Sequence, residues 1–170
     1  MDHVYDYVER SEIVPFVPSN SRIVLDVGCS RGGFATALRR TGRALEIWGV
    51  DNDPTILAEA SPRYDRFLLG TYPEALAGIE TEFDCIVFND VLEHMPDPWQ
   101  VLRATRGLLS SRGSVVASIP NVRYLPVSVR LLLKGDFTYS RTGVMDRTHL
   151  RFFTMRSMRD LFETSGFSVV

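Results

Sequence analysis

The chain has 170 residues, which is enough for one domain with its own hydrophobic core and short for two. Hydrophobic residues make up 45% and charged residues 24%, and the formal net charge is −2, so the composition argues against a broad basic surface for nucleic acid. No run approaches the roughly 18 apolar residues of a membrane span, and the N-terminus lacks a basic region followed by an apolar one, so we expect a cytoplasmic protein without a membrane partner.

Apolar runs alternate with helix signals along most of the chain. A short helix is predicted over 4–14. Strands are then expected at 23–27, 45–50, 66–69, 83–88, 114–119 and 167–170, and helices at 33–41, 54–60, 73–78, 98–109 and 155–165. Nearly all-apolar strands between helices predict a doubly wound, Rossmann-like α/β fold, with a mostly parallel sheet and helices on both faces. Such sheets bind ligands at the carboxyl ends of their strands.

One segment interrupts this alternation. About thirty residues separate the fifth strand from the last helix, far more than the usual short connection. Residues 124–134 within it predict an amphipathic helix. We therefore treat the chain as a single domain in which 121–153 is an inserted lid or substrate cap over the ligand crevice.

A glycine-rich turn, Gly28-Cys-Ser-Arg-Gly32-Gly33, follows the first expected strand and precedes the first long helix. Strand, turn and helix N-terminus in that order form a site for a nucleotide-like ligand. Asp26 ends the strand, where its carboxylate repels a pyrophosphate and attracts an ammonium or sulfonium group. That charge favours S-adenosylmethionine over a dinucleotide, and Ser30 stands at the second glycine of the dinucleotide pattern.

Asp51 ends the second strand, about 20 residues beyond the turn. A carboxylate at that place can accept two hydrogen bonds from a ribose diol. NAD-binding proteins share this spacing, so Asp51 alone does not separate the two cofactor classes. The alternative is that Asp51 is only the polar residue that precedes a helix.

Three stretches together resemble class I S-adenosylmethionine-dependent methyltransferases: Asp26-Val-Gly28-Cys-Ser-Arg-Gly32, Gly49-Val-Asp51, and Phe83-Asp-Cys-Ile-Val-Phe-Asn-Asp90-Val-Leu-Glu-His94-Met-Pro-Asp-Pro98. The small-molecule branch, which includes quinone-biosynthesis and sugar-tailoring enzymes, is the most similar, and 146–154 and 165–167 also fit it. The resemblance covers residues 20–170. It implies methyl transfer from S-adenosylmethionine to a sugar, a quinone-like compound or another metabolite.

The resemblance assigns the methionine end of the cofactor to the turn. Asp26 would bind the methionine amino group, directly or through water. The backbone of Gly28 and its neighbours Cys29, Ser30 and Gly32 would pass beneath that moiety. Ser30 replaces a common glycine, which would narrow the turn without abolishing binding.

The resemblance assigns the nucleoside to later strand ends. Asp51 would hold the ribose hydroxyls and Asn52 would flank the adenine. Thr71 and Tyr72 would border the adenine ring, and Asn89 would approach the methionine portion. Thr71 stands where many relatives have an acid, so the contact with the adenine amino group is less defined.

The resemblance also bears on the end of the chain. Relatives finish with two edge strands, whereas this sequence offers only the expected strand at 167–170. We expect a fold that lacks the final family strand, and a chain that is a fragment of a longer protein or that covers its exposed sheet edge by forming a homodimer.

Two histidines are candidate catalytic residues. His94 follows the fourth strand and would act as a general base if the acceptor is a hydroxyl or another protonated nucleophile. Alternatively, Glu93 and His94 only organise the loop before Asp97. His149 is the second candidate, which Asp146 would orient if the segment turns helically, although we favour a role for His149 in pinning the inserted segment to the sheet.

Other polar and aromatic groups leave alternatives open. Three scattered histidines and two cysteines expected in the core do not predict a metal site. Phe137, Tyr139, Phe152 and Phe153 would line an acceptor pocket or simply pack the insertion. Five arginines would bind an anionic acceptor or form a solvated face: Arg123, Arg130, Arg141, Arg147 and Arg151. The rival functions are a non-catalytic cofactor-binding or interaction domain and, against the charge of Asp26, a nicotinamide-dependent oxidoreductase.

Overall fold

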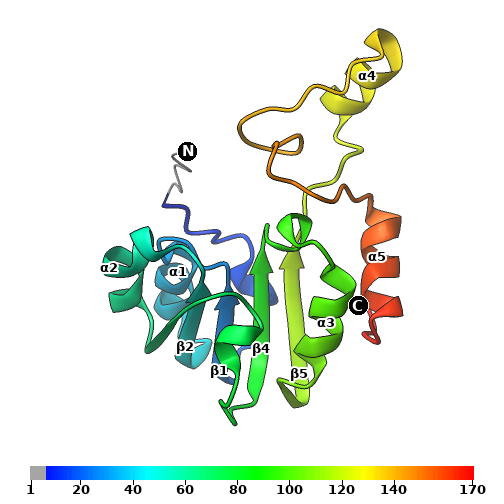
Figure 1. Cartoon of the computed structure of the whole chain (residues 1–170). Coiled ribbons are helices and arrows are strands. Elements are labelled where there is room, and N and C mark those ends of the chain that lie inside the picture. The colour runs from blue at the N-terminus through cyan, green and yellow to red at the C-terminus, as the bar shows by residue number, and fades with distance from the viewer. Residues whose placement is uncertain (1–6) are drawn as a thin grey trace. The chain divides into compact units, whose positions relative to one another are not determined.

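The computed structural model describes residues 7–170, and it confirms the α/β fold with a parallel sheet (Figure 1). Five strands lie in the order β3-β2-β1-β4-β5. Their bounds are β1 Ser21–Val27, β2 Ala44–Asp51, β3 Arg66–Leu69, β4 Phe83–Asn89 and β5 Leu109–Ser118. The order reverses between β1 and β4, so the carboxyl ends of these two strands flank the switch point at which such sheets bind ligands.

The register of the central strands fixes which residues share the sheet edge. Asp26 on β1 lies opposite Gly49 on β2 and Val87 on β4. Asp51 ends β2 opposite Leu69 of β3. The carboxyl ends of parallel strands meet at one edge, so residues that follow β1, β2 and β4 in the sequence come together there.

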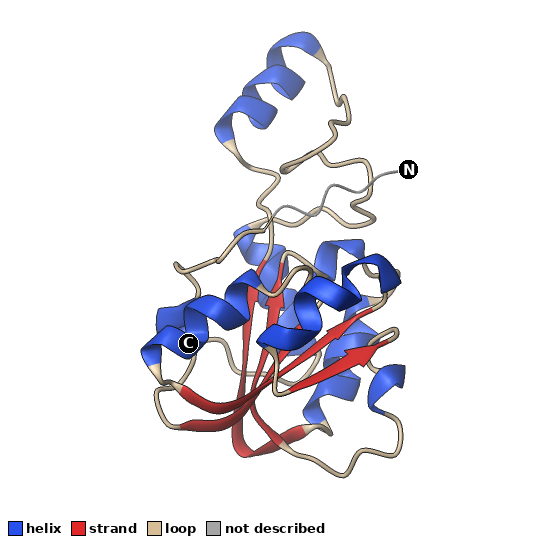
Figure 2. Cartoon of the chain, turned by 90° about the vertical axis from the view of Figure 1, so that its left-hand side faces the viewer, coloured by secondary structure: helices blue, strands red, loops and turns tan. Residues whose placement is uncertain are grey.

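Three α-helices lie between successive strands, α1 Gly33–Thr41, α2 Leu57–Ala60 and α3 Pro98–Arg106, and two follow β5, α4 Leu125–Lys134 and α5 Met155–Thr164 (Figure 2). Short 3₁₀ helices lie at η1 Val14–Phe16, η2 Pro54–Ile56, η3 Ser61–Arg63, η4 Glu74–Leu76 and η5 Leu92–His94. The helix predicted over 33–41 is matched end to end. Gly42 ends α1 in a left-handed conformation with φ of 63°.

The main hydrophobic core lies where α1 packs against the sheet. Alternate residues of the strands face it, including Val24, Ile47 and Val87, and α1 contributes Phe34 and Leu38. All five side chains are at most 3% exposed. Their burial holds the N-terminus of α1, and hence the glycine turn, against β1.

Four predicted elements differ from the structure. In the predicted helix over 4–14, residues 4–6 lie outside the described residues and 7–13 form no helix. This stretch instead runs close against the start of α1, since a Cβ added at Gly33 would lie only 2.2 Å from the Val8 carbonyl oxygen. Only Glu74–Leu76 is helical within 73–78. No strand forms at 167–170, so the edge strand expected there, the basis for the homodimer, is absent from this structure.

The fourth difference concerns β5. Its predicted start was 114, with a helix up to 109, whereas α3 ends at Arg106 and β5 begins at Leu109. The composition of the polar run Ser110–Ser114 is untypical of a strand, but a side chain of β4 gives Ser110 a hydrogen-bond partner. Ser110 donates a 2.9 Å hydrogen bond to the Asp84 carboxylate, and the Phe83 amide donates to the Leu108 carbonyl oxygen at 2.8 Å. Tertiary pairing thus overrides local composition.

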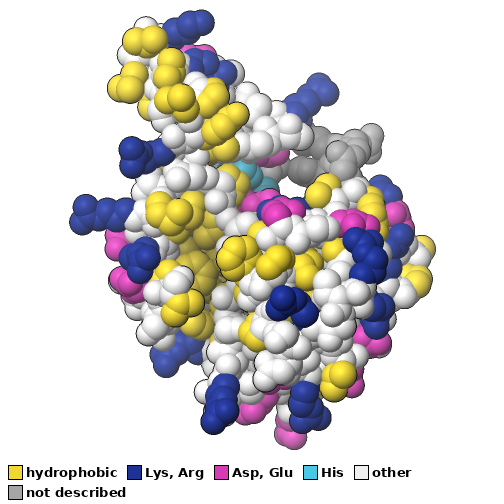
Figure 3. Space-filling view, turned by 180° about the vertical axis from the view of Figure 1, so that it is seen from behind, with side chains coloured by type: hydrophobic (Ala, Val, Ile, Leu, Met, Phe, Trp, Pro, Cys, Tyr) yellow, Lys and Arg dark blue, Asp and Glu magenta, His cyan; other side chains and the backbone are white. Residues whose placement is uncertain are grey.

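The chain divides into two compact units, Met1–Asn89 with Ala104–Ala117, and Asp90–Arg103 with Ser118–Val170. The second unit contains α4, the expected amphipathic helix. No residue of α4 is buried, and Leu125, Leu132 and Leu133 are strongly exposed, as the yellow side chains over this helix in Figure 3 show. Among the described residues, no helix has both the length and the apolar character to cross a bilayer.

Candidate functional site

The glycine turn adopts a backbone that side chains rarely allow. Gly28 and Gly32 have φ values of 64° and 76°, and Ser30 between them has φ of 47°. Ser30 therefore keeps a left-handed conformation that glycine adopts more easily, at a cost in strain of order 1 kcal/mol or more. The amides of Gly28 and Cys29 both donate to the Val50 carbonyl oxygen, at 2.9 and 3.3 Å, which ties the turn to the end of β2.

Asp26 lies beneath this turn and is almost fully buried, with 1% exposure. The Tyr64 hydroxyl donates a 2.7 Å hydrogen bond to Asp26 Oδ2. Burial raises the pKa of Asp26 from 3.8 to about 7; the Tyr64 bond opposes the shift and the negative charge of Asp51 adds to it. A positively charged ligand group would stabilise the ionised form of such a carboxyl group, because it would replace the water that burial has removed from the carboxylate.

Asp51 links the turn to the end of β2. Its Oδ2 accepts from the Ser30 amide at 2.8 Å and its Oδ1 from the Asp53 amide at 3.0 Å. Burial raises the pKa of Asp51, while these backbone bonds oppose the rise. Each carboxylate oxygen retains a lone pair for a further donor. Asn52 beside it is exposed, and Asp53 caps η2 by accepting from the Thr55 amide at 2.8 Å.

A cavity of about 120 Å³ opens beside the turn in the first unit. Its walls include Asp26, Gly28, Cys29, Ser30 and Asn89 from the predicted set, and Val8, Arg10, Arg31, Gly33 and Phe34 from outside it. The cavity is smaller than the roughly 300–1,000 Å³ of pockets that enclose a whole organic ligand, so it suits one polar end of such a ligand.

Two polar side chains of the cavity wall have unsatisfied hydrogen-bonding capacity. The Ser30 hydroxyl and both polar atoms of the Asn89 amide are buried and form no hydrogen bond with the described residues. A buried amide without partners costs roughly 1–3 kcal/mol per group, so native proteins rarely keep one without a reason. A ligand with both donors and acceptors would satisfy these groups.

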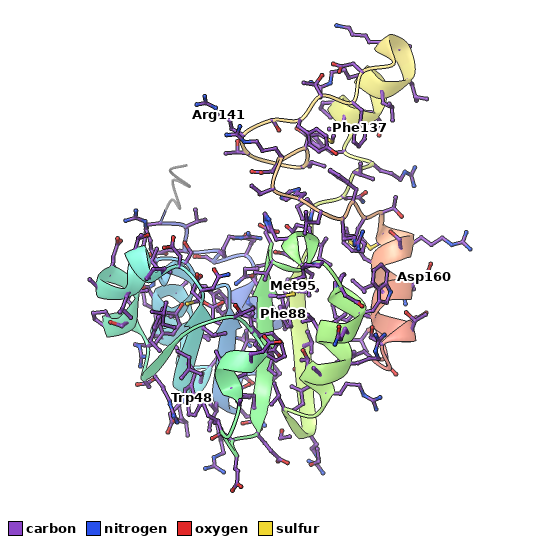
Figure 4. All side chains as sticks on the ribbon, in the orientation of Figure 1. Trp48, Phe88, Met95, Phe137, Arg141 and Asp160 are labelled. Atoms are coloured by element: carbon purple, nitrogen blue, oxygen red, sulfur yellow. The ribbon has the colours of Figure 1, made fainter. Side chains whose placement is uncertain are left out.

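Gly32, Thr71 and Tyr72 do not line this cavity. Thr71 is exposed, whereas Tyr72 is 6% exposed and packs edge-to-face on Phe88 with ring centroids 5.6 Å apart. The Tyr72 hydroxyl is 2.8 Å from that of Thr105. Figure 4 labels Phe88 on β4, against which Tyr72 packs. The side chain of Tyr72 thus belongs to the core, and only its backbone is left for a ligand contact.

His94 and His149 lie side by side in the second unit, although 55 positions separate them in the sequence. Their ring centroids are 4.7 Å apart at an interplanar angle of 77°. His94 Nδ1 lies 3.2 Å from the Thr148 carbonyl oxygen, and His149 Nδ1 lies 3.1 Å from that of Val144. Partial burial of the ring and the neighbouring His149 lower the pKa of His94.

Glu93 joins this pair from a buried position. It is 1% exposed, and its Oε1 lies 3.9 Å from His149 Nε2. The Glu93 carbonyl oxygen accepts from the Leu150 and Arg151 amides at 2.8 and 3.1 Å. His149 is therefore held against the loop that follows β4.

The alternative in which Asp146 orients the His149 ring differs from the hydrogen bonds of the structure. Asp146 Oδ1 accepts from the Thr148 amide at 2.8 Å and from the Thr148 hydroxyl at 2.7 Å, so it stabilises its own turn. A backbone carbonyl, that of Val144, orients the imidazole instead. Local carboxylate-to-amide bonds of this kind form easily two residues apart and compete with longer contacts.

The aromatic residues of the inserted segment pack on one another. The rings of Phe137, labelled in Figure 4, and Phe152 have centroids 5.5 Å apart, and that of Tyr139 lies about as close to both. Phe153 is 3% exposed. A separate cavity of about 260 Å³ lies in the same unit between α4 and residues 140–145, lined by Tyr124, Val127, Arg130 and Met145 among others.

Tyr64, Arg10 and Glu93 are among the residues of these sites that sequence reasoning missed. Tyr64 was given no role because a lone tyrosine after a short helix carries no signal. Arg10 falls in a stretch with no recognisable motif, and Glu93 was assigned only to loop organisation. Tyr64 contacts Asp26 across 38 positions of the chain and Glu93 pairs with His149 across 56, whereas Arg10 shares a cavity wall with Asn89, 79 positions away.

Comparison with known proteins adds independent findings. A family model described as a methyltransferase domain matches residues 5–170. A ubiquinone biosynthesis O-methyltransferase of Xylella fastidiosa is 29% identical over 153 residues, which cover 81% of this chain and 61% of that protein. The chain thus spans about three fifths of that relative.

Solved structures share the fold. A SAM-dependent methyltransferase from Archaeoglobus fulgidus superposes with a TM-score of 0.71 at 20% identity, over 92% of this chain and 65% of that one. The plantazolicin methyltransferase BamL, solved with SAH, superposes with a TM-score of 0.73 at 15% identity, over 96% and 63%. These similarities extend along nearly the whole of the present chain.

Proposed function

Because the chain belongs to the methyltransferase domain family, we propose that it transfers a methyl group from S-adenosylmethionine to a small-molecule acceptor. The cofactor would supply an electrophilic methyl group on a sulfonium centre, so that a bond from the acceptor to this carbon would form in line as the carbon–sulfur bond breaks and S-adenosylhomocysteine leaves. Positioning of the two molecules and exclusion of water provide most of the acceleration in such a reaction.

The observation that carries this proposal is the unsatisfied polar lining beside Asp26. The amino-acid end of the cofactor has an ammonium donor and a carboxylate acceptor. Asp26 would attract the ammonium group, and Asn89 and Ser30 would gain the partners that they lack in the described structure. Arg10 on the same wall would offer a positive charge to the carboxylate.

The nucleoside end would bind beyond the turn. Asp51 has already anchored the Ser30 amide with one oxygen, which fixes its orientation, and its remaining lone pairs would accept the ribose hydroxyls. Asn52 is exposed beside it, and Thr71 is exposed at the end of β3, so both stay candidates for the adenine. No pyrophosphate is favoured near two buried carboxylates, which speaks against a dinucleotide.

The acceptor is proposed to be an uncharged or weakly anionic metabolite with a nucleophilic oxygen. The Xylella fastidiosa relative described above is named as an O-methyltransferase of ubiquinone biosynthesis, so phenolic acceptors are the first to test. In this proposal, residues 121–153 select the acceptor, with the second cavity and its Arg130 as the candidate surface. His94 and His149 stay candidate general bases, each through the Nε2 that its backbone bond leaves available.

Isothermal titration of the chain with S-adenosylhomocysteine tests the cofactor site. One equivalent is expected to bind. Asp51→Asn is expected to weaken binding at least about tenfold, because one of the two carboxylate oxygens that would accept from the ribose hydroxyls is replaced by a donor NH₂ group. Asp53→Asn is the matched control, since an asparagine oxygen can still cap η2. A folded wild-type sample that binds no S-adenosylhomocysteine would contradict the proposal.

Turnover is tested separately, with labelled S-adenosylmethionine and a panel of catechols, phenols and sugars. Transfer of label to one class identifies the acceptor. Binding of the cofactor product without transfer to any class would favour the rival reading, a cofactor-binding domain without catalysis.

A further inference from the structure

We propose that the cavity between α4 and residues 140–145 binds a molecule with one carboxylate group on an apolar body, and that Arg130 recognises the carboxylate. That this molecule is the methyl acceptor rests on the proposed function, whereas its binding in this cavity does not. All the residues that carry the inference belong to the second unit.

The cavity combines apolar walls with one cationic side chain. Its volume is about 260 Å³, and its walls include Val127 and Val144, which are half-buried, and Met145, which is 3% exposed. Among the described residues that line it, Arg130 alone is charged. Such a lining suits an amphipathic molecule, because the apolar part leaves water while the charged group finds a partner.

The chain beyond α4 holds the Arg130 side chain in place. Gly135 ends α4 in a left-handed conformation with φ of 61°, and residues 136–138 contact Arg130. Arg130 Nη2 donates a 3.0 Å hydrogen bond to the Thr138 carbonyl oxygen, and the Thr138 hydroxyl donates to the Asp136 carboxylate. A guanidinium that is already oriented loses less conformational entropy when it binds a ligand.

Much of the hydrogen-bonding capacity of this guanidinium is unused. A guanidinium has five N–H donors in one plane, and the bond to Thr138 uses one of them. Nε is buried and lies 3.3 Å from Asp136 Oδ2, yet it forms no hydrogen bond with the described residues. Paired N–H donors of this kind match the two oxygens of a carboxylate, so Arg130 can bind one bidentately.

The charge around the cavity favours an anion of low charge. Residues 121–153 contain six Lys and Arg side chains and two Asp side chains, a net charge of +4, although the whole chain carries −2. An anion is therefore attracted to this segment. The Asp136 carboxylate lies next to the Arg130 guanidinium and offsets part of its charge. It would repel a doubly charged phosphate more than a carboxylate, which carries a single charge.

The structure separates Arg130 from the other arginines of the inserted segment. The other four are exposed and do not line the cavity: Arg123, Arg141, Arg147 and Arg151. Arg141 is labelled in Figure 4. In this proposal Arg130 binds the anionic group, and the exposed arginines form a solvated face that adds only long-range attraction.

The test is binding of benzoate, benzyl alcohol and phenyl phosphate to the intact chain, followed by NMR of ¹³C-labelled methionine methyl groups. The chain has five methionines, and Met145 lines the cavity, so the variant Met145→Leu identifies its signal. Benzoate should shift the Met145 signal to saturation. It should bind at least about tenfold more tightly than benzyl alcohol, because charge-assisted bonds to Arg130 are lost with the alcohol.

The measurement uses no cofactor, so its outcome is separate from that of the proposed function. A chain that binds S-adenosylhomocysteine but not benzoate would refute this inference alone. A chain that binds benzoate but not S-adenosylhomocysteine would refute the proposed function alone.

Variants decide whether Arg130 is the recognising group. Arg130→Gln should reduce benzoate binding to the level of benzyl alcohol. Arg141→Gln is the matched control, because it removes the same charge from an exposed position outside the cavity. Asp136→Asn keeps an oxygen for the Thr138 hydroxyl and removes a negative charge, so it should strengthen binding of phenyl phosphate more than that of benzoate. This variant carries the test if Arg130→Gln fails to fold.

Three outcomes would overturn the proposal. One is a folded wild-type chain in which benzoate leaves the Met145 signal unchanged. Another is wild-type binding of benzyl alcohol or phenyl phosphate as tight as that of benzoate. The third is a preference for benzoate that survives Arg130→Gln, or that Arg141→Gln reduces equally.

Discussion

The Tyr64 hydroxyl donates a 2.7 Å hydrogen bond to Oδ2 of Asp26, joining residues 38 positions apart in the chain. Tyr64 is 7% exposed and Asp26 is 1% exposed, so the bond is made in a region shielded from water. It is the direct side-chain contact that favours the ionised form of a carboxyl group which burial would otherwise keep protonated. Tyr64 therefore holds the Asp26 side chain in place and favours the ionised form that the proposed cofactor site needs.

Tyr64→Phe should raise the pKa of Asp26 further above about 7, because it removes the bond that opposes the effect of burial. Binding of an ammonium group needs the ionised carboxylate. The affinity for S-adenosylhomocysteine should therefore fall as the pH drops below about 7 in wild type, and from a higher pH in the variant. At pH 7 the variant should bind severalfold more weakly, and at pH 9 nearly as well.

Titrations by calorimetry between pH 6 and pH 9 measure both midpoints. The neighbours of Asp26 are Asp51, whose charge raises its pKa, and Cys29, whose own pKa burial raises, so the thiol stays neutral in this range. Tyr72→Phe is the matched control, because that buried hydroxyl contacts Thr105 instead. Identical midpoints for wild type and Tyr64→Phe would refute the role of Tyr64.

Asp26→Asn should stabilise the free protein at pH 8. The folded-state pKa of about 7 lies above the ordinary 3.8, so the folded protein holds this proton more tightly, and stability is lost as the pH rises from about 4 to about 7. At about 1.4 kcal/mol per pKa unit the penalty is roughly 4 kcal/mol above pH 7. Asparagine carries no such penalty and still offers an oxygen to Tyr64.

Urea unfolding at pH 5 and pH 8 measures this effect. The stability advantage of Asp26→Asn over wild type should be several-fold larger at pH 8, while S-adenosylhomocysteine binding is lost at both. An advantage independent of pH would mean that Asp26 is not the carboxyl group that burial perturbs.

Asn89→Leu should separate stability from binding. The Asn89 amide is buried without a hydrogen-bond partner among the described residues, and leucine has a similar volume without polar atoms to satisfy. Replacing an unsatisfied group by an apolar one is neutral or stabilising, so the free energy of unfolding should stay or rise. The affinity for S-adenosylhomocysteine should fall, because the ligand loses its partner. A variant that is less stable yet binds normally would place the amide in a structural role.

Gly33→Ala should weaken cofactor binding through the backbone. A Cβ at this position would lie 2.2 Å from the Val8 carbonyl oxygen, so residues 8–10 must move, and with them two walls of the cavity. We expect destabilisation of about 1–3 kcal/mol and weaker binding of S-adenosylhomocysteine. Gly107→Ala is the control, since its nearest neighbour would be 3.5 Å away. Thermal unfolding and calorimetry of both variants distinguish the two positions; equal effects would contradict the close approach of Val8.

The residues of β1, β2 and β4 show how far sequence alone reaches. Their apolar runs and the glycine turn after Asp26 predicted strand positions within two residues, because buried parallel strands have little choice of composition. The end of the chain and the start of β5 were misjudged. Pairing with a neighbouring strand decides whether a segment becomes a strand, and no local sequence pattern specifies that neighbour. The apolar residues 167–170 therefore stay unpaired, whereas the polar residues 110–114 pair.

The sequence by itself determined the alternation of the five strands with α1, α2 and α3, the turn and the two carboxylates that flank it, since these follow from hydrophobic periodicity and from the conformations that glycine permits. Only the tertiary structure decided that Tyr64 hydrogen-bonds to Asp26, that Arg10 and Asn89 line the same cavity, and that the Glu93 carboxylate lies next to the His149 ring. These three pairs join residues 38 to 79 positions apart, and their energies come from burial and hydrogen bonds that exist only after the chain has folded.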